Sequence, residues 1–288
     1  MKEMNDLLLA EIVERALRED LGFGDITTDR IVPADRSARG LIQCKDNGVL
    51  AGIEVARRVF QHLDPQVTFI AFKRDGQALR PGDLIAEISG SARAILSGER
   101  VALNFLQRLS GIATQTHRYA EKVKDYTAVI VDTRKTTPGL RVLEKYAVRM
   151  GGGNNHRFGL YDAVLIKDNH IKIAGGIKEA VERVRGQIPH TMKIEVEVES
   201  LAQLEEALAA KAEIILLDNM SPELLRQAVA LTGGRALLEA SGGVTEATVT
   251  EIAAAGVDLI SVGALTHSVK ALDLSLDIDQ VKGIKQEV

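Results

Sequence analysis

The chain has 288 residues, enough for one large or two modest domains, and 45% of them are hydrophobic. The net charge of −4 argues against a general affinity for nucleic acid or anionic membranes, and 3% aromatic residues are too few for base-stacking platforms. A single cysteine, Cys44, excludes an internal disulfide and a cysteine-based zinc cluster. The N-terminal pattern lacks the uninterrupted apolar core of a signal peptide, and no apolar run approaches the ~18 residues of a membrane span. We therefore expect a cytoplasmic protein that binds neither nucleic acid nor membranes.

The first 111 residues have a mixed pattern and are predicted to form an α/β sandwich domain. Helices are expected over 4–20 and 53–62, with strand-like segments at 38–46, 67–76 and 83–90. The stretch RDGQALRPGDLIAEISG (74–90) resembles the flattened sandwich of biotinyl and lipoyl carrier domains. No lysine is suitably placed at a hairpin tip, so a structural domain is favoured over a carrier. A long helical pattern follows over 97–124, in which Gly111 marks either a break or a close contact.

From residue 128 the pattern changes to short apolar runs that alternate with helical segments. The six expected strands lie at 128–133, 162–168, 193–198, 213–219, 236–243 and 259–264. Their spacing of roughly 20–30 residues predicts right-handed βαβ units and a parallel sheet. Ser200, Ser221 and Thr245 are suitable residues to begin the helices that follow three of them.

Six strands are too few for a complete barrel of eight. A complete (β/α) barrel usually needs about 200 residues or more, so the pattern favours an incomplete or small barrel, or an open doubly wound sheet. The segment KALDLSLDID (270–279) breaks the rhythm by alternating, and we expect it to leave the barrel and pair with the N-terminal domain. The predicted domains are therefore 1–111, joined by 267–288, and 112–266.

Every one of the six runs ends in charged, hydroxylated or glycine residues. Ligand sites of parallel α/β folds lie at the carboxyl ends of strands, although a single charge there is usually a solvated loop residue or a helix cap. Glu195, Glu197 and Glu199 alternate with valines, so we expect all three on one face, the barrel interior if the valines face the helices. The alternative is a solvated edge strand.

Basic residues form a second group, which two early loops would bring together. Its expected members are Arg134, Lys135, His156, Arg157 and Lys167, with Arg100 added from the helix before the barrel. A basic pocket in an acidic chain indicates a polyanionic small molecule, since guanidinium groups match carboxylates and phosphates.

Two loops near the end of the barrel are candidates for a phosphate site. Ser241, Gly242 and Gly243 follow a strand and open a helix, and Gly263 lies in a similar loop one unit later. The alternative is that these glycines serve only tight turns. The triple glycine at 151–153 is interpreted differently, as a small-residue loop that lets His156 and Arg157 approach a bound ligand.

The stretch DTRKTTPGLRVLEKYAVRMGGGNNHRFGLYDAVLIKDNH (132–170) closely resembles the matching part of the quinolinate phosphoribosyltransferase family. The resemblance extends to SGERVALNFLQRLSGIAT, EVEVE, ILLDN, EASGG and SVGALTHS, and to GDITT near the N-terminus. It implies an N-terminal α/β sandwich and an incomplete (β/α) barrel. It also implies an enzyme of NAD biosynthesis that joins phosphoribosyl pyrophosphate to quinolinate and releases pyrophosphate and CO₂, leaving nicotinate mononucleotide.

The resemblance also implies roles for individual residues. Arg134, His156, Arg157 and Lys167 would bind quinolinate, and Lys135 would meet the dicarboxylate or the pyrophosphate. Glu197 and Asp218 would hold ribose hydroxyls and Mg²⁺, directly or through water. Ser241, Gly242, Gly243 and Gly263 would bind the 5-phosphate. The implied catalytic set is Lys135, Lys167, Glu197 and Asp218. The implied assembly is a homodimer, with hexamers as a further option, in which Arg100 enters the partner's site.

Three alternatives compete with this interpretation. The first is a related transferase that uses another acceptor, such as nicotinate. The second is a barrel lyase or aldolase that uses Lys167 or Lys135 as a Schiff base, which requires an apolar setting. The third is a non-catalytic binding or carrier module, which would leave the residues at the strand ends without a purpose.

Overall fold

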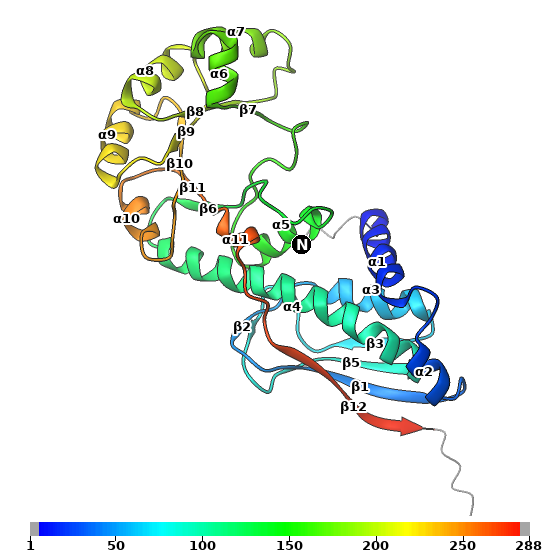
Figure 1. Ribbon diagram of the computed structural model, residues 1–288. Helices are drawn as coiled ribbons and strands as arrows, with labels where there is room; N and C mark the ends of the chain where they lie inside the picture. The colour runs from blue at the N-terminus through cyan, green and yellow to red at the C-terminus, as the bar shows by residue number, and fades with distance from the viewer. Residues whose placement is uncertain (1–5, 283–288) are drawn as a thin grey trace, which may run out of the picture. The chain divides into compact units, whose positions relative to one another are not determined.

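The structure is a computed structural model that describes residues 6–282, and the chain divides into two compact units (Figure 1). Within the described range, the first unit comprises 6–115, 137–152 and 268–282, and the second comprises 116–136 and 153–267. Helix α4 (Ala92–Val123) contributes residues to both units. Residues 137–152, which the sequence pattern assigned to the barrel, belong to the first unit and contain helix α5 (Arg141–Met150).

The first unit is built on a four-stranded antiparallel sheet in the order β12–β1–β5–β3. These strands are β1 (Ser37–Cys44), β3 (Thr68–Ala71), β5 (Leu84–Ser91) and β12 (Leu274–Lys282). A smaller sheet pairs β2 (Gly48–Val49) with β4 (Ala78–Leu79). The other helices of this unit are α1 (Asp6–Leu21), α2 (Ile26–Ile31) and α3 (Ile53–Leu63). Alternate residues of β1 are buried, as expected for a strand with one face on a core.

Helix α4 runs through Gly111 without a break. A Cβ atom on Gly111 would lie 2.3 Å from the carbonyl oxygen of Lys270, so only a glycine lets the two backbones approach this closely. Of the two options that the sequence left open, the structure therefore shows the close contact.

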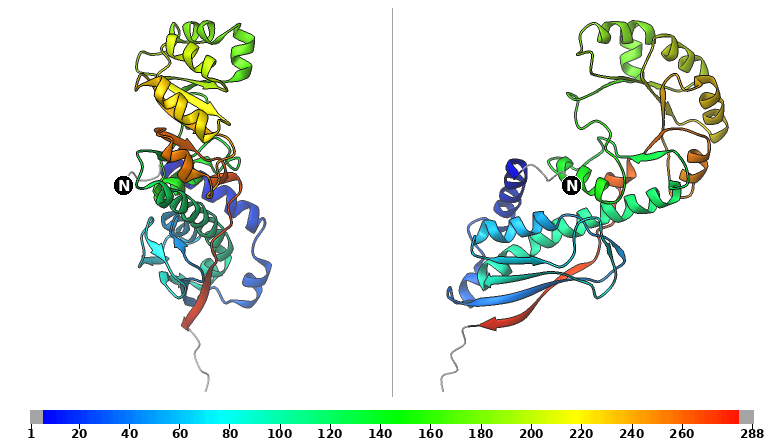
Figure 2. Two further views of the ribbon diagram at one scale, coloured as in Figure 1. Left: turned by 90° about the vertical axis from the view of Figure 1, so that its left-hand side faces the viewer. Right: turned by 180° about the vertical axis from the view of Figure 1, so that it is seen from behind.

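The second unit contains six parallel strands in the order β6–β11–β10–β9–β8–β7. The strands are β6 (Val129–Val131), β7 (Val164–Ile166), β8 (Ile194–Val198), β9 (Ile214–Asp218), β10 (Leu237–Ser241) and β11 (Leu259–Ser261). Because β6 and β7 are both edge strands, the barrel is incomplete, and the predicted α/β fold class is confirmed. Figure 2 shows from two further sides that helices line the outside of the curved sheet.

The helices of the second unit follow its strands. They are α6 (Asp168–Ala174), α7 (Ile177–Arg185), α8 (Leu201–Ala209), α9 (Pro222–Thr232), α10 (Val249–Ala254) and α11 (Ala264–His267). Ser200 and Ser221 cap α8 and α9 as predicted. The expectation for Thr245 was wrong, because Thr245 and Thr248 first form a hydrogen-bonded turn and α10 begins only at Val249. None of the helices in residues 6–282 combines the length and the apolar character needed to cross a membrane.

Candidate active site

A pocket of about 640 Å³ lies at the carboxyl ends of the barrel strands, entirely within the second unit. Ten of the twelve predicted site residues line it: Arg134, Lys135, His156, Arg157, Lys167, Glu197, Asp218, Ser241, Gly242 and Gly243. Parallel strands bring their carboxyl ends to one edge, so residues as far apart in the sequence as Thr133 and Ser261 meet here. The pocket therefore gathers five of the six residues of the basic group, two of the acids and one glycine loop.

The basic half of the pocket is anchored by Asp132, which is fully buried directly after β6. Its carboxylate accepts a hydrogen bond from Asn155 Nδ2 at 2.6 Å and another from the backbone N–H of His156 at 2.9 Å. These bonds tie the glycine-rich loop to the first barrel strand. The triple glycine thus precedes a loop that presents His156 and Arg157 to the pocket.

Arg157 has donor capacity that the protein does not use. Its Nη1 atom donates to the carbonyl oxygen of Ala163 at 3.1 Å, while its buried Nε atom has no hydrogen-bond partner. Burial lowers the pKa of Arg157, and the positive charge of nearby Arg134 lowers it further. Two guanidinium groups held close together in a partly buried pocket favour an anion with several oxygen atoms.

The acidic half of the pocket contains Glu197 and Asp218, from the neighbouring strands β8 and β9. Lys167 Nζ forms an ion pair with Glu197 Oε2. Burial raises the pKa of Asp218, and the charge of Glu197 raises it further, so the two carboxylates repel each other across the site. A divalent cation, which carboxylate oxygens bind, would relieve this repulsion, and so would hydroxyl groups that donate hydrogen bonds to the two carboxylates.

Two buried carboxylates, those of Glu195 and Glu239, form a layer of buried acid beside His156 in the basic half. His156 Nε2 lies 3.1 Å from Glu195 Oε2 and 3.6 Å from Glu239 Oε1. These three groups are close enough to share one metal ion. Burial raises the pKa of Glu239 to about 7, with the charge of Glu195 as the second cause. Glu199, expected on the same face as Glu195 and Glu197, lies beyond the end of β8 and does not line the pocket.

The loop after β10 has the conformation that a phosphate cradle requires. Gly242 and Gly243 have φ angles of 90° and 60°, which favour glycine and turn successive N–H groups to one side. Gly263 does not line the pocket, but a Cβ at this position would lie 3.0 Å from the Lys135 side chain. The loop after β6 is joined to helix α11, where Thr266 Oγ1 donates to the carbonyl oxygen of Lys135 at 2.8 Å.

Arg100 is the other predicted residue that does not line the pocket. It lies on α4 in the first unit, beside a separate hollow lined by Asp20, Asp25 and Ser97. Sequence reasoning assigned no role to six residues that do line the pocket: Thr133, Leu165, Leu216, Asn219, Glu239 and Ser261. Asn219 ends the apolar run 213–219 and Glu239 lies near the end of the run 236–243, so their positions at strand ends could have pointed to them.

The incomplete barrel and its pocket define a protein of the (β/α)-barrel class whose site carries both basic and acidic side chains. Sequence models of the quinolinate phosphoribosyl transferase N-terminal and C-terminal domains match residues 25–110 and 112–277. The chain therefore belongs to the quinolinate phosphoribosyltransferase family.

Individual relatives agree with this assignment. The chain is 48% identical to a probable nicotinate-nucleotide pyrophosphorylase [carboxylating] of Bacillus subtilis, over 96% of this chain and 95% of that one. It is 44% identical to the chloroplastic enzyme of that name from Arabidopsis thaliana, over 94% and 83%. Among solved structures, NadC from Streptococcus pyogenes superposes with a TM-score of 0.93 at 45% identity, over 98% of this chain and 99% of that one.

Proposed function

We propose that this chain transfers the phosphoribosyl group of phosphoribosyl pyrophosphate to quinolinate and releases CO₂, forming nicotinate mononucleotide in NAD biosynthesis. The observation that carries this proposal is the pocket itself, which Arg134 and Arg157 line together with Glu197, Asp218 and a glycine loop. Membership of the family supports the same conclusion.

The basic half is proposed to bind quinolinate. The two carboxylates of this acceptor match Arg134, Arg157 and Lys167, and the free Nε donor of Arg157 is available to one of them. His156 completes this half in our proposal. The pyridine nitrogen attacks with its own lone pair, so the site needs no general base. The protein contributes mainly orientation and charge neutralisation.

The acidic half and the glycine loop are proposed to hold the phosphoribosyl donor. Ser241, Gly242 and Gly243, with Gly263 nearby, would bind the 5-phosphate through N–H groups. A bond forms between the pyridine nitrogen and ribosyl C1 as the bond from C1 to pyrophosphate breaks, and pyrophosphate keeps that electron pair. Glu197 and Asp218 stabilise the positive charge that develops at C1, while Lys135 faces the leaving group.

Loss of CO₂ follows from the charge on the new ring. The bond between C2 and its carboxylate breaks, and the cationic ring accepts the electron pair that remains at C2. A proton then adds at C2. The guanidinium groups bind both carboxylates of quinolinate before this step. Because one carboxylate then leaves as CO₂, the product is bound by fewer charged contacts than quinolinate was.

Mg²⁺ is proposed to bind at Glu197 and Asp218, directly or through water. The donor set fits, because these carboxylates repel each other and hard oxygen ligands suit Mg²⁺. When bound, the ion would neutralise charge on the pyrophosphate. In the alternative group of His156, Glu195 and Glu239, both carboxylates are buried, so an ion bound there would be less accessible to the pyrophosphate of the donor.

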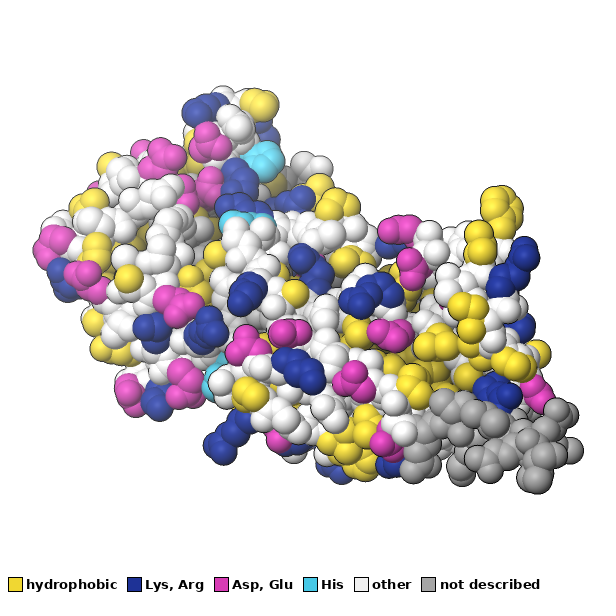
Figure 3. Space-filling view, turned by 60° about the horizontal axis from the view of Figure 1, so that its bottom comes forward, with side chains coloured by type: hydrophobic (Ala, Val, Ile, Leu, Met, Phe, Trp, Pro, Cys, Tyr) yellow, Lys and Arg dark blue, Asp and Glu magenta, His cyan; other side chains and the backbone are white. Residues whose placement is uncertain are grey.

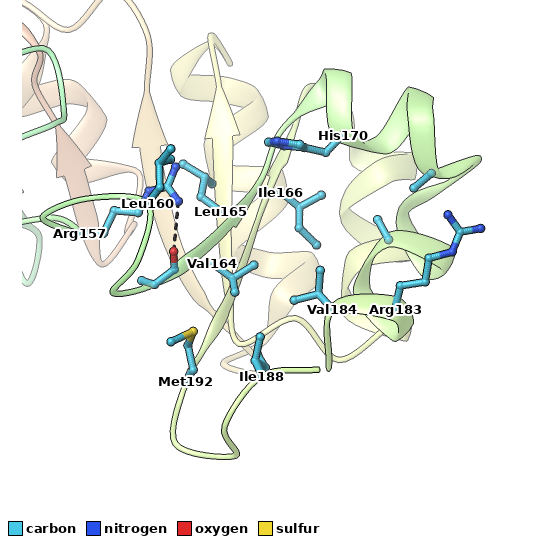
Figure 4. Close-up of a pocket in the computed structure, with 13 residues that line it drawn as sticks. Arg157, Leu160, Val164, Leu165, Ile166, His170, Arg183, Val184, Ile188 and Met192 are labelled. Atoms are coloured by element: carbon cyan, nitrogen blue, oxygen red, sulfur yellow. Dashed lines mark hydrogen bonds between the residues drawn. The ribbon is translucent and has the colours of Figure 1, made fainter. Parts of the chain in front are cut away.

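A homodimer with a shared site is proposed, and the open edge of the barrel supports it. An apolar hollow of about 470 Å³ lies along β7, with Val164, Ile166, Val184 and Met192 pointing into it (Figure 4). Leu160, Tyr161 and Ile173 are exposed on the second unit, and Phe23, Ile26 and Ile31 on the first. In Figure 3, hydrophobic side chains, drawn in yellow, form a group on the right-hand part of the face shown. A second copy would cover such surfaces and could supply Arg100.

Mixing two inactive variants tests the shared site. Arg100→Ala and Arg134→Ala subunits should regain partial activity when they are combined, because one of the two sites in a mixed dimer would be intact. No recovery, in a mixture shown to exchange subunits, would exclude sharing through Arg100. Assembly beyond the dimer and the cytoplasmic location stay predictions.

The acceptor assignment is tested by comparing quinolinate with nicotinate. Nicotinate mononucleotide and labelled CO₂ should form from quinolinate, phosphoribosyl pyrophosphate and Mg²⁺, and nicotinate should release pyrophosphate at least about a hundredfold more slowly. Equal rates with both acceptors would overturn the assignment. The Schiff-base alternative is disfavoured because Lys167 is 45% exposed and paired with Glu197, whereas such a lysine requires an apolar setting.

A further inference from the structure

Asn219 connects the two parts of the site that are proposed to hold the phosphoribosyl donor. It follows Asp218 directly at the end of β9 and lines the same pocket. Its Nδ2 atom donates to Asp218 Oδ2 at 2.8 Å, and its backbone N–H donates to the carbonyl oxygen of Ser241 at 2.9 Å. One residue is thus bonded both to a carboxylate of the acidic half and to the glycine loop.

The backbone of Asn219 is in the left-handed region, with φ at 53°. Among the described residues other than glycine, only Lys211, with φ at 60°, shares this feature. Glycine adopts such angles without strain, and asparagine tolerates them better than most residues. If only the backbone conformation mattered, glycine would fit position 219 best. The presence of an amide side chain there therefore needs a separate explanation.

The side chain of Asn219 packs closely against Gly242. A Cβ atom at residue 242 would stand 2.1 Å from Asn219 Oδ1 and 2.5 Å from its Cγ atom. The amide therefore occupies the space that the missing side chain of Gly242 leaves. With the oxygen end against the glycine loop, the nitrogen end faces Asp218, where a hydrogen-bond donor stabilises the ionised carboxylate.

We infer that Asn219 is a positioning residue, which fixes the carboxylate of Asp218 relative to the loop Ser241–Gly243 so that ribose and 5-phosphate are bound in one geometry. This inference rests on the proposed function, because it concerns the phosphoribosyl donor. It assigns to Asn219 an action through Asp218 and the glycine loop, to which it is hydrogen-bonded. Its effect should fall on binding of the donor and leave binding of quinolinate intact.

Two substitutions separate the side chain from the backbone conformation. Asn219→Gly keeps the left-handed backbone and removes the amide, and Asn219→Asp keeps the shape but replaces the donor with a negative charge beside Asp218. Lys211→Gly is the matched control, since it relaxes the other left-handed residue at an exposed position outside the pocket. Circular dichroism and thermal unfolding establish that each variant is folded.

The measurements are the KM values of both substrates, and the Kd of phosphoribosyl pyrophosphate obtained by calorimetry without quinolinate. Asn219→Gly should raise KM and Kd for phosphoribosyl pyrophosphate by roughly ten- to a hundredfold, the loss expected for a hydrogen bond to a charged group, and Asn219→Asp by at least as much. The KM for quinolinate should stay within about twofold, and Lys211→Gly should match the wild type in all values.

Two outcomes would overturn the inference. One is a folded Asn219→Gly variant with wild-type affinity for phosphoribosyl pyrophosphate, and the other is an equal rise of both KM values. Failure of the proposed function would look different, because the wild-type chain would then form no nicotinate mononucleotide from quinolinate. The Kd comparison needs no acceptor, so it also tests Asn219 if the wild-type chain binds phosphoribosyl pyrophosphate but uses an acceptor other than quinolinate.

Discussion

The Nε2 atom of His156 lies 3.1 Å from Oε2 of Glu195, and this contact connects the basic half of the pocket to a layer of buried acid. Glu239 completes the layer at 3.6 Å from the same nitrogen and is almost fully buried. Two carboxylates beside one imidazole leave an excess of negative charge when all three groups are ionised. The layer should therefore make the stability of the protein depend on pH.

Glu239→Gln should reduce this dependence. The pKa of Glu239 is raised from 4.5 to about 7, mainly by burial, so between these values the folded state binds more protons at this site than the unfolded state does. The free energy of unfolding must then fall as the pH rises through this window, by up to about 3 kcal/mol for such a shift. Glutamine has no proton to lose and should remove that part of the slope.

Urea unfolding of both proteins between pH 5 and pH 8 checks this prediction. The wild type should lose stability toward pH 8 relative to Glu239→Gln, and the two curves should converge near pH 5. Parallel curves across the range would show that Glu239 does not titrate in the folded protein as its burial implies.

Removal of the Asp132 carboxylate should weaken binding of quinolinate. Asp132→Ala would leave the Asn155 amide and the His156 N–H without this acceptor, so the loop would lose its attachment to β6. We expect the KM for quinolinate to rise about tenfold or more, in line with the loss of one or two hydrogen bonds to a charged group. The KM for phosphoribosyl pyrophosphate should change much less, because the glycine loop after β10 has separate supports.

Asp258→Ala is the matched control for this change. Asp258 also accepts a backbone N–H, that of Leu238 at 2.8 Å, but it lies at the amino ends of the strands and does not line the pocket. It should lower thermal stability with both KM values unchanged. If Asp132→Ala only lowered stability in the same way, the proposed role of this anchor in substrate binding would be wrong.

The pocket could be predicted from the sequence because parallel strands have a simple geometry. Once the apolar runs were placed, the residues that follow them, such as Lys167 and Asp218, had to meet at one edge. Side-chain partners could not be predicted in this way. The bond from Asn155 to Asp132 and the contact from His156 to Glu195 depend on how a loop of irregular backbone folds back, which no periodic pattern specifies.

The placement of α5 is a second feature that the sequence pattern did not predict. Its sequence follows the first barrel strand, so the alternating pattern assigned it to the barrel, yet residues 137–152 belong to the first unit. A contact across 36 positions joins α5 to this unit: the fully buried carboxylate of Glu144 accepts hydrogen bonds from Arg108 Nε at 2.9 Å and Nη2 at 2.6 Å. Contacts of this kind are decided by tertiary packing and leave no local signal.

Breaking that contact should destabilise the protein strongly. Arg108→Met would leave the Glu144 carboxylate buried with the Thr137 N–H as its remaining partner among these bonds. We expect a loss of about 3 kcal/mol in the free energy of unfolding, because an uncompensated buried charge costs more than a lost surface pair. The double variant Arg108→Met/Glu144→Gln should recover much of this loss in urea unfolding. An equally unstable double variant would mean that Arg108 acts through packing of its aliphatic chain instead.

Gly111→Ala should also destabilise the protein, although alanine is the better helix former. In an exposed helix this change would stabilise by about 0.5–1 kcal/mol. Here the new Cβ would meet the Lys270 carbonyl oxygen at 2.3 Å and Ala271 Cα at 3.2 Å, and backbone atoms cannot rotate away as a side chain can. Overpacking of this kind should cost about 1–3 kcal/mol.

The control for Gly111→Ala is Gly186→Ala, at the end of α7. Gly186 has a right-handed conformation with φ at −72°, and the nearest atom to its new Cβ would be 3.7 Å away. Thermal unfolding should show a lower Tm for Gly111→Ala and an unchanged or slightly higher Tm for Gly186→Ala. A Gly111→Ala variant as stable as the wild type would mean that α4 and the segment Lys270–Ala271 can separate without cost, and the glycine would then have no packing role.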